Sequence, residues 1–453
     1  MLPISEREKS ARVIQTSGSA GPDTDAQVER SQQMFDPWLT SRSAVVIRIV
    51  ELLLMEYDER IAPGRKRKIK ARDRANLEVM LHAVIANIVY VIAFGVEPPT
   101  VGVSLRSAKQ KLTRYDRPGF KGLPKVLETF SGLGNFFTLQ KSTRKGIASA
   151  IVPMMPFAAE LYSDYRFAPN AFRQSEGREP IQLARTDHDF VSDTSTRELI
   201  DYRDTSETER YRTEMRTING FLSKAKIEMG SYDGALVMSS QRQLHRCFNL
   251  PPWSEEGEER FDYGGRLFGG WWQRLPKDLR HAIRINGEPI ADLDYSSCFL
   301  RLAYLQAGTP PPEGDLYAMV PGLSEPCWRD GVKKAASTML FRTSPLTRLP
   351  RDLKGDLPPG TSGAQVRSAI LYAHPALKDV FETGIGFRLM FVESQVLVAA
   401  LLRLVNQGIP ALPMHDGLMV ARSKADAAAK AMLDASEQVT GVRLPITLKS
   451  QYK

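Results

Sequence analysis

The spacing of apolar residues predicts a largely helical first third of the chain. The stretches 43–57 ("SAVVIRIVELLLMEY") and 76–95 ("NLEVMLHAVIANIVYVIAFG") place apolar side chains three and four residues apart, which is typical of helices. The second stretch is long enough to cross a membrane, but Glu78, His82 and Asn87 interrupt it. We therefore expect a buried helix and no membrane span.

Further short elements follow this helix. The stretches "VSLRSAKQKLTRY" and "LPKVLETFSGLG" predict two helices, the second ending at a glycine-rich stop. "NFFTLQKSTRKGIASAIVP" then predicts two short strands around a basic turn, Lys141 to Gly146. This is the order of a winged helix, in which a helix enters the DNA groove and the hairpin touches the phosphate backbone. The sequence therefore predicts a helical, winged-helix-like, nucleic-acid-binding region over residues 36–165.

Basic side chains gather in this region, as nucleic-acid contact requires. They are Lys109, Lys111, Arg114, Lys121, Lys125, Lys141, Arg144 and Lys145. In the predicted turn, Lys141, Arg144 and Lys145 are the candidates for phosphate contact. The run "RKRKIKARDR" (65–74) adds further positive charge, although a solvated helix start is an alternative interpretation. For the whole region, the alternative is a structural domain without a ligand.

Polarity divides the rest of the chain. Residues 1–35 are polar and rich in Ser, Gly and Asp, which predicts disorder. Residues 166–205 are charged and have few apolar runs, which predicts a linker. A long helical pattern, "ETERYRTEMRTINGFLSKAKIEM", leads into the C-terminal region, which we assign to residues 206–453.

Two aspartates are predicted to lie at strand ends. "PIADLDY" alternates like a strand and "SSCFLRLAYLQAG" then becomes helical, so Asp294 ends a strand immediately before a helix. In "GIPALPMHDGLMVARS", Asp416 lies beside His415 at the tip of a predicted hairpin. Two such carboxylates around a pair of Mg²⁺ ions are what two-metal phosphoryl transfer requires. Asp292, on the same strand face as Asp294, is a further candidate, whereas an isolated aspartate is by default a surface or turn residue.

Two other stretches carry candidate ligand-binding residues. "CWRDGVKKAASTMLFRTSP" predicts a helix on which Arg329 and Lys333 can bind a triphosphate while Phe341 contacts a base or sugar. The alternative is an amphipathic helix with solvated charges. "FDYGGRLFGGWWQRLP" places paired glycines around Arg266, which lets the backbone approach a ligand closely. This stretch lacks the spacing of a dinucleotide-binding loop.

These four stretches, in chain order, resemble the polymerase domain shared by family A DNA polymerases and single-subunit, phage-type RNA polymerases. "DLDYSSCFLR" and "PMHDGLMV" resemble its first and last metal-binding motifs, and the Arg-x3-Lys followed by Phe resembles its nucleotide-binding fingers helix. "DYGGRLF" resembles an Arg-containing motif of both enzyme groups, and "MFVESQVLVAALLRL" resembles the helix before the final hairpin. The resemblance covers about residues 260–425.

The resemblance implies an α+β fold in which an antiparallel palm sheet and helical fingers follow the winged-helix-like module. It implies template-directed nucleotidyl transfer on DNA with nucleoside triphosphates, by a two-metal mechanism that uses Mg²⁺ or, as a substitute, Mn²⁺. The implied residues are Asp294 and Asp416 at the metals, Lys333 and Arg329 at the triphosphate, Phe341 and Phe299 at the nucleotide, and Arg266 and His415 at the template or primer.

The sequence departs from the family pattern at two positions that bear on sugar choice. Phe299 stands where the DNA enzymes have a Glu that excludes the ribose 2′-hydroxyl, and Phe341 stands where Tyr is usual. A bulky ring can still obstruct a 2′-hydroxyl, so DNA synthesis is slightly favoured. The alternatives are a primase or RNA polymerase that makes RNA on a DNA template, and a non-catalytic nucleic-acid-binding regulator with a decayed polymerase fold.

The composition agrees with a globular protein that binds a polyanion. Apolar residues make up 42% and charged residues 25%, and 61 Lys and Arg against 52 Asp and Glu give a formal charge of +9. Cys247, Cys298 and Cys327 lack metal-ligand spacing, which argues against a zinc site and favours a reducing compartment. We therefore expect a cytoplasmic protein, associated with the nucleoid if it is bacterial or phage-encoded.

Overall fold

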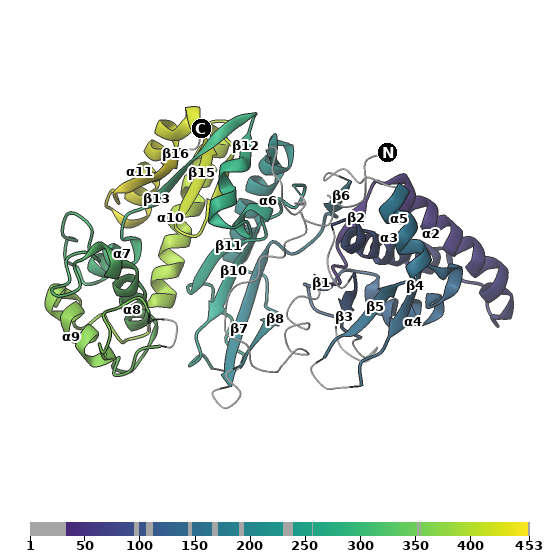
Figure 1. The fold of residues 1–453 in the computed structure, drawn as a ribbon, viewed down its shortest axis with the longest axis horizontal. Helices are drawn as coiled ribbons and strands as arrows, with labels where there is room; N and C mark the ends of the chain where they lie inside the picture. Colours follow the sequence, from purple (N-terminus) through teal and green to yellow (C-terminus); the bar gives the residue numbers. More distant parts are fainter. Residues whose placement is uncertain are drawn as a thin grey trace, which may run out of the picture.

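The computed structural model describes residues 33–94, 99–105, 112–143, 147–164, 171–189, 194–229, 239–255, 257–350, 353 and 355–451. Within them the chain forms a mixed α+β structure with several β-sheets. Most of the segment predicted to be disordered, residues 1–32, lies outside the described residues. Figure 1 shows an elongated molecule with the N-terminal helices at one end and the helices of residues 298–373 at the other.

The N-terminal region combines helices with a small sheet. Its elements are β1 (Gln33–Met34), β2 (Leu39–Ser41), α2 (Ala44–Glu56), α3 (Ala71–Ala93), β3 (Val101–Val103), α4 (Leu123–Phe130), β4 (Phe137–Gln140), β5 (Ser149–Pro153), α5 (Met155–Asp164) and β6 (Phe172–Gln174). One sheet has the strand order β1-β3-β5-β4, and β2 pairs with β6. These elements share one hydrophobic core that runs from Leu39 to Phe172.

Helix α3 forms the centre of this core. Asn87 interrupts its apolar run for a structural reason: its side chain accepts from the Asp36 N–H at 2.9 Å and donates to the carbonyl oxygens of Asp36 and Ala83. By length and composition alone, α3 and the helix Gly386–Asn406 are long and apolar enough to cross a membrane. However, 67% and 50% of their apolar windows are buried inside the protein. Both are therefore core helices in this structure, and the expectation of a buried helix at residues 76–95 is confirmed.

The predicted strand pair is present, whereas the described residues show no helix in one of the two stretches predicted to be helical. Strands β4 and β5 pair antiparallel around the basic turn, and α4 lies where the second short helix was expected. In "VSLRSAKQKLTRY" the described residues are not helical, and residues 106–111 lie outside them. Val103 ends a strand that pairs with β5. Asp116 accepts from the Thr113 N–H at 2.9 Å, which favours a turn.

The second region contains two further sheets and most of the helices. Its elements are β7 (Ile181–Asp189), β8 (Thr194–Ile200), α6 (Ser206–Lys224), β9 (Ile227–Met229), β10 (His245–Leu250), β11 (Gly264–Phe268), β12 (Ile283–Ile285), β13 (Glu288–Tyr295), α7 (Cys298–Gln306), α8 (Arg329–Phe341), α9 (Gly363–Ala373), α10 (Gly386–Asn406), β14 (Ala411–Met414), β15 (Gly417–Ala421), α11 (Ala425–Thr440) and β16 (Ile446–Gln451). A second hydrophobic core unites them.

The linker predicted over 166–205 is wrong for β7 and β8. These strands continue a sheet with the order β11-β10-β7-β8, in which β7 pairs parallel with β10 and antiparallel with β8. The inward side chains Ile181 and Leu183 are fully buried. The alternate residues Gln182 and Ala184 are also buried, and because one is polar and the other small, the segment lacks the apolar run that is typical of a fully buried strand.

Strand β13 is the central strand of the last sheet. It pairs antiparallel with β12, β15 and β16, and β14 and β9 continue the sheet on its two sides. Figure 1 shows α10 as a long helix that runs from this sheet towards the separate group formed by α7, α8 and α9. The antiparallel sheet expected in this part of the chain is therefore present, and Asp294 lies near the end of its central strand.

Candidate active site

Asp294 and Asp416 lie next to each other at one end of strands β13 and β15, in the sheet that is centred on β13. In the pairing of β13 with β15, Asp294 is opposite Gly417, and the Tyr295 N–H bonds to the Asp416 carbonyl oxygen at 3.4 Å. Asp416 is half-buried in the two-residue turn between β14 and β15, while Asp294 is only 7% exposed. Strand pairing thus brings together two carboxylates that are more than a hundred residues apart in the sequence.

Burial and mutual repulsion govern the electrostatics of this pair. Burial and the nearby charge of Asp416 raise the pKa of the Asp294 carboxyl, and Lys449 opposes this rise. One oxygen of Asp294, Oδ2, is paired with Lys449, whereas Oδ1 is buried and has no hydrogen-bond partner among the described residues. Burial also raises the pKa of Asp292. Leaving a buried carboxylate oxygen without a partner is costly, and a cation relieves this cost.

The donor set fits a hard divalent cation. Mg²⁺ takes oxygen ligands and is usually held by one or two carboxylates together with waters and substrate phosphates. Asp294 Oδ1 and the Asp416 carboxylate are oxygen donors of this kind, and the unpartnered Oδ1 is the observation that favours them as a site.

Arg266 is held beside the aspartates by a residue that the sequence did not single out. Its Nε and Nη2 donate to the two carboxylate oxygens of Glu393 at 2.6 and 3.1 Å, in a bidentate pair. Glu393 lies on α10 and is almost completely buried. Burial raises the pKa of the Glu393 carboxyl to about 7, although Arg266 opposes the rise. A charged residue inside the apolar run "MFVESQVLV" was the sequence signal for this partner.

A bulge in β11 lies directly beside Arg266. The register between β10 and β11 shifts after Cys247, which faces Arg266, so that Gly264 faces Phe248. The extra residue is Gly265, which has a φ of 86°. A Cβ there would meet the Ser394 hydroxyl of α10, so only glycine permits this close approach of strand and helix.

An aromatic cluster lies beside Arg266. Its guanidinium carbon is 5.3 Å from the centre of the Phe299 ring, and the rings of Phe299 and Phe341 are 5.9 Å apart. Phe341 also packs edge-on against Phe387. The structure thus brings Arg266, Phe299 and Phe341 together, although they come from β11, α7 and α8.

Within the described residues, no ion pair joins the cations predicted on α8 to Asp294 or Asp416. Arg329 forms an ion pair with Asp315, which also accepts from the Ser297 hydroxyl at 3.1 Å and so links Arg329 to the turn after β13. Lys333 is exposed, and no contact joins it to Asp294 within the described parts of the chain. Twelve residues at 1.5 Å each separate Arg329 from Phe341 by about 18 Å along the helix.

The remaining predicted contact residues are at the surface or undescribed. His415 is exposed at the tip of the hairpin, with a φ of 54°. Lys141 is exposed and pairs with Glu128 at 2.5 Å. Arg144 and Lys145 lie outside the described residues, so the structure does not bear on them.

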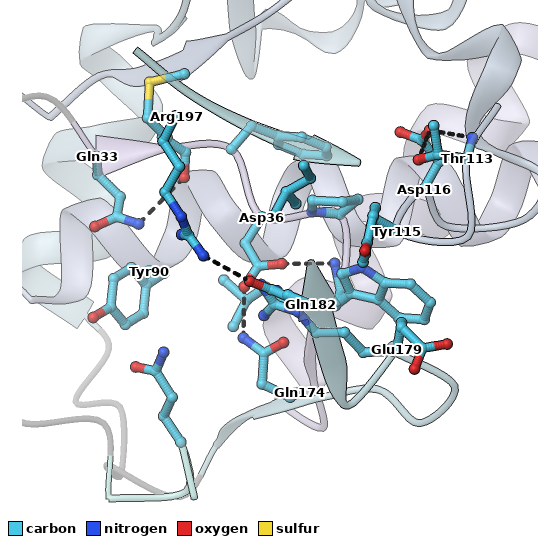
Figure 2. Close-up of a pocket in the computed structure, with 18 of the residues that line it drawn as sticks. Gln33, Asp36, Tyr90, Thr113, Tyr115, Asp116, Gln174, Glu179, Gln182 and Arg197 are labelled. Atoms are coloured by element: carbon cyan, nitrogen blue, oxygen red, sulfur yellow. Dashed lines mark hydrogen bonds between the residues drawn. The ribbon is translucent and has the colours of Figure 1, made fainter. Parts of the chain in front are cut away.

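A large cavity lies away from these groups, between the N-terminal segment and the sheet of β7 and β8. It has a volume of about 960 Å³. Figure 2 shows Asp36 in it, bonded to Gln174, and Arg197 directed at Gln182. Its polar groups bond largely to one another, so it does not resemble the acidic site.

Comparison of the chain with models of protein families and with curated proteins finds no match.

Proposed function

We propose that this protein is a nucleic-acid polymerase that transfers nucleotides to a primer on a DNA template, with deoxynucleotides slightly favoured. The observation that carries the proposal is the unpartnered Oδ1 of Asp294 beside the half-buried Asp416. Arg266 lies over the ring of Phe299 and is close enough to Asp416 for their charges to interact. Carboxylates bind divalent cations, and aromatic rings together with a cation bind nucleotides, so this combination favours a metal ion and a nucleotide as ligands.

The polymerase interpretation extends to the architecture. The antiparallel sheet around β13 corresponds to a palm, and α7, α8 and α9 correspond to fingers. We propose that α3, β3, α4, β4 and β5 of the N-terminal region form the winged-helix-like module. We propose that its hairpin contacts duplex DNA through Lys141, Arg144 and Lys145.

The chain's own residues have separate roles in this mechanism. Asp294 and Asp416 would hold two Mg²⁺ ions, whose chemistry is to make the primer 3′-hydroxyl more acidic and to stabilise the departing pyrophosphate. Glu393 holds Arg266 in one orientation towards the template or primer, and His415 contacts the primer end.

A second set of residues binds the nucleotide. The rings of Phe299 and Phe341 form the apolar wall against which its sugar and base pack, and Arg329 and Lys333 bind the triphosphate. Lys333 also donates a proton to the departing pyrophosphate. Catalysis of this kind depends on positioning and charge stabilisation.

Primer extension tests the proposal. The protein is given a primed or an unprimed DNA template, Mg²⁺, and either deoxynucleotides or ribonucleotides. We expect extension of the primed template by the wild type, and loss of extension in Asp416→Asn with unchanged DNA binding. Asp379→Asn, which changes an exposed aspartate, is the control.

The other outcomes decide between the alternatives. Synthesis from ribonucleotides alone, or on an unprimed template, would favour an RNA polymerase or a primase. An Asp416→Asn protein that extends primers at the wild-type rate would contradict the assignment of Asp416 to the active site. Absence of synthesis by the wild type under every condition, with DNA binding retained, would favour a non-catalytic regulator.

A further inference from the structure

Lys449 reaches Asp294 because of an irregularity in β16. Ser450 pairs with Asp292, and Leu448 pairs with the next residue of β13, Leu293. Lys449 is therefore the extra residue of a β-bulge. Bulges re-aim side chains and are common beside active sites. Here the bulge directs a lysine towards the acidic end of the central strand.

The ammonium group of Lys449 contacts the carboxylate of Asp294 and lies near two other aspartates. It forms an ion pair with Asp294 Oδ2, and the charges of Asp416 and Asp292 also act on it. Arg266 also interacts electrostatically with Asp416, but its guanidinium group is already bonded to Glu393. Lys449 thus neutralises part of the negative charge of these aspartates.

We propose that Lys449 is a tethered counter-ion that competes with divalent metal ions for Asp294, so that metal binding displaces it. This inference deepens the proposed function and rests on its metal site. The ammonium group occupies Oδ2, while Oδ1 is left without a partner. The proposed function needs two metal ions at Asp294 and Asp416, so one of them would compete with the lysine for Oδ2.

The position of Lys449 allows such an exchange. Its side chain is 45% exposed, whereas that of Asp294 is 9% exposed. The flexible four-carbon stem can therefore turn into solvent without disturbing the core. The site then contains a cation in both states, which avoids two buried carboxylates without any compensating charge. The consequence is a weaker affinity for metal ions in the absence of substrate.

The experiment measures binding of Mn²⁺ to the full chain by electron paramagnetic resonance, without nucleotide or template. We expect Lys449→Met to bind Mn²⁺ at least about tenfold more tightly than the wild type, because the competing cation is gone. Lys449→Arg keeps the charge and should remain close to the wild type. The control is Lys430→Met, which removes an exposed lysine that pairs with Asp434 on α11.

Thermal melting provides a second measurement. In a chelator, Lys449→Met should melt below the wild type, and Mn²⁺ should raise its melting temperature more than that of the wild type. If Lys449→Met is unfolded in chelator, refolding on addition of Mn²⁺ supports the proposal, and failure to refold contradicts it.

The outcomes separate this inference from the proposed function. Equal or weaker Mn²⁺ binding by Lys449→Met overturns the counter-ion role and leaves the polymerase proposal standing. Tighter binding that disappears in Lys449→Met/Asp294→Asn supports the counter-ion role even if no nucleotide is incorporated. Absence of Mn²⁺ binding by the wild type and by Lys449→Met overturns both.

Discussion

Gly417 lies directly across the sheet from Asp294, so close that a Cβ at Gly417 would be 2.8 Å from Asp294 Oδ1. The same Cβ would collide with the carbonyl oxygen of Leu293. The space next to the unpartnered carboxylate oxygen thus exists because residue 417 has no side chain. This relationship makes the glycine after the His-Asp pair part of the candidate site.

Gly417→Ala should therefore affect both folding and metal binding. Because neither the backbone of β13 nor a buried carboxylate can move easily, we expect a loss of about 1–3 kcal/mol in the free energy of unfolding. Mn²⁺ affinity should fall as Asp294 is displaced. Gly220→Ala is the control, because a Cβ at this exposed position of α6 meets nothing within 4 Å. Denaturant unfolding and Mn²⁺ titration check the prediction, and a Gly417→Ala protein as stable as the wild type would contradict it.

Glu393→Gln should destabilise the protein and slow nucleotide transfer. Removing one partner of a buried ion pair leaves the other charge uncompensated, which costs about 3 kcal/mol. Arg266 would lose its fixed orientation, so the rate of primer extension should fall more than the affinity for nucleotide. The control is Glu437→Gln, which breaks an exposed pair with Arg443 and should cost less than about 1 kcal/mol. Unfolding and primer-extension kinetics measure the two effects, and similar losses in both variants would mean that the buried pair is unimportant.

Phe299→Ala should relax the choice of sugar. If the Phe299 ring obstructs a 2′-hydroxyl, its removal should raise ribonucleotide incorporation by roughly tenfold for each 1.4 kcal/mol of relieved clash. The ratio of ribonucleotide to deoxynucleotide incorporation in single-turnover assays measures the change. Phe268→Ala, which removes a more exposed ring from β11, serves as the control. An unchanged ratio would show that another residue sets the choice of sugar.

The stability of the fold should depend on pH through His245. Burial lowers the pKa of His245 to about 3, and Arg178, Arg197 and Arg274 add to the shift. Its pKa in the unfolded chain is about 6.5, so the unfolded state binds an extra proton below this pH and stability is lost as the pH falls from about 6.5 towards 3.

Between about pH 7.5 and about pH 5.5, this linkage removes about 1.4 kcal/mol from the wild type. His245→Asn should lose less stability over the same interval, whereas His281→Asn, at an exposed histidine, should behave like the wild type. Denaturant unfolding at both pH values measures the difference. Identical losses in the wild type and His245→Asn would mean that His245 takes up its proton in the folded protein.

The basic turn should contribute to DNA affinity through salt-dependent interactions. Changing Lys141, Arg144 and Lys145 together to Gln should weaken duplex binding and flatten the log–log dependence of affinity on salt by about one unit for each phosphate that the turn no longer binds. Fluorescence anisotropy over a range of salt concentrations measures the slope. A triple Gln variant of Lys378, Lys424 and Lys430, which are exposed elsewhere, removes the same charge. An unchanged slope in the turn variant would indicate a structural hairpin.

The sequence alone determined the local elements that carry the candidate residues. Helical spacing of apolar residues predicted α2 and α3, because burying one face of a helix requires that period. Alternation followed by helical spacing placed Asp294 at the end of a strand, and a short polar pair between apolar runs placed Asp416 in a turn. These features depend on residues near one another in the chain, so a linear pattern is sufficient to predict them.

Only the tertiary structure decided which distant residues meet. Lys449 reaches Asp294 through a bulge in a strand pairing, and Glu393 meets Arg266 where α10 approaches β11. Strands β7 and β8, predicted as linker, are ordered by pairing with β10 and with each other. Such pairings join residues far apart in the chain, and their stability comes from burial and hydrogen bonds that form only when the whole sheet assembles. No periodic pattern within a single segment records them.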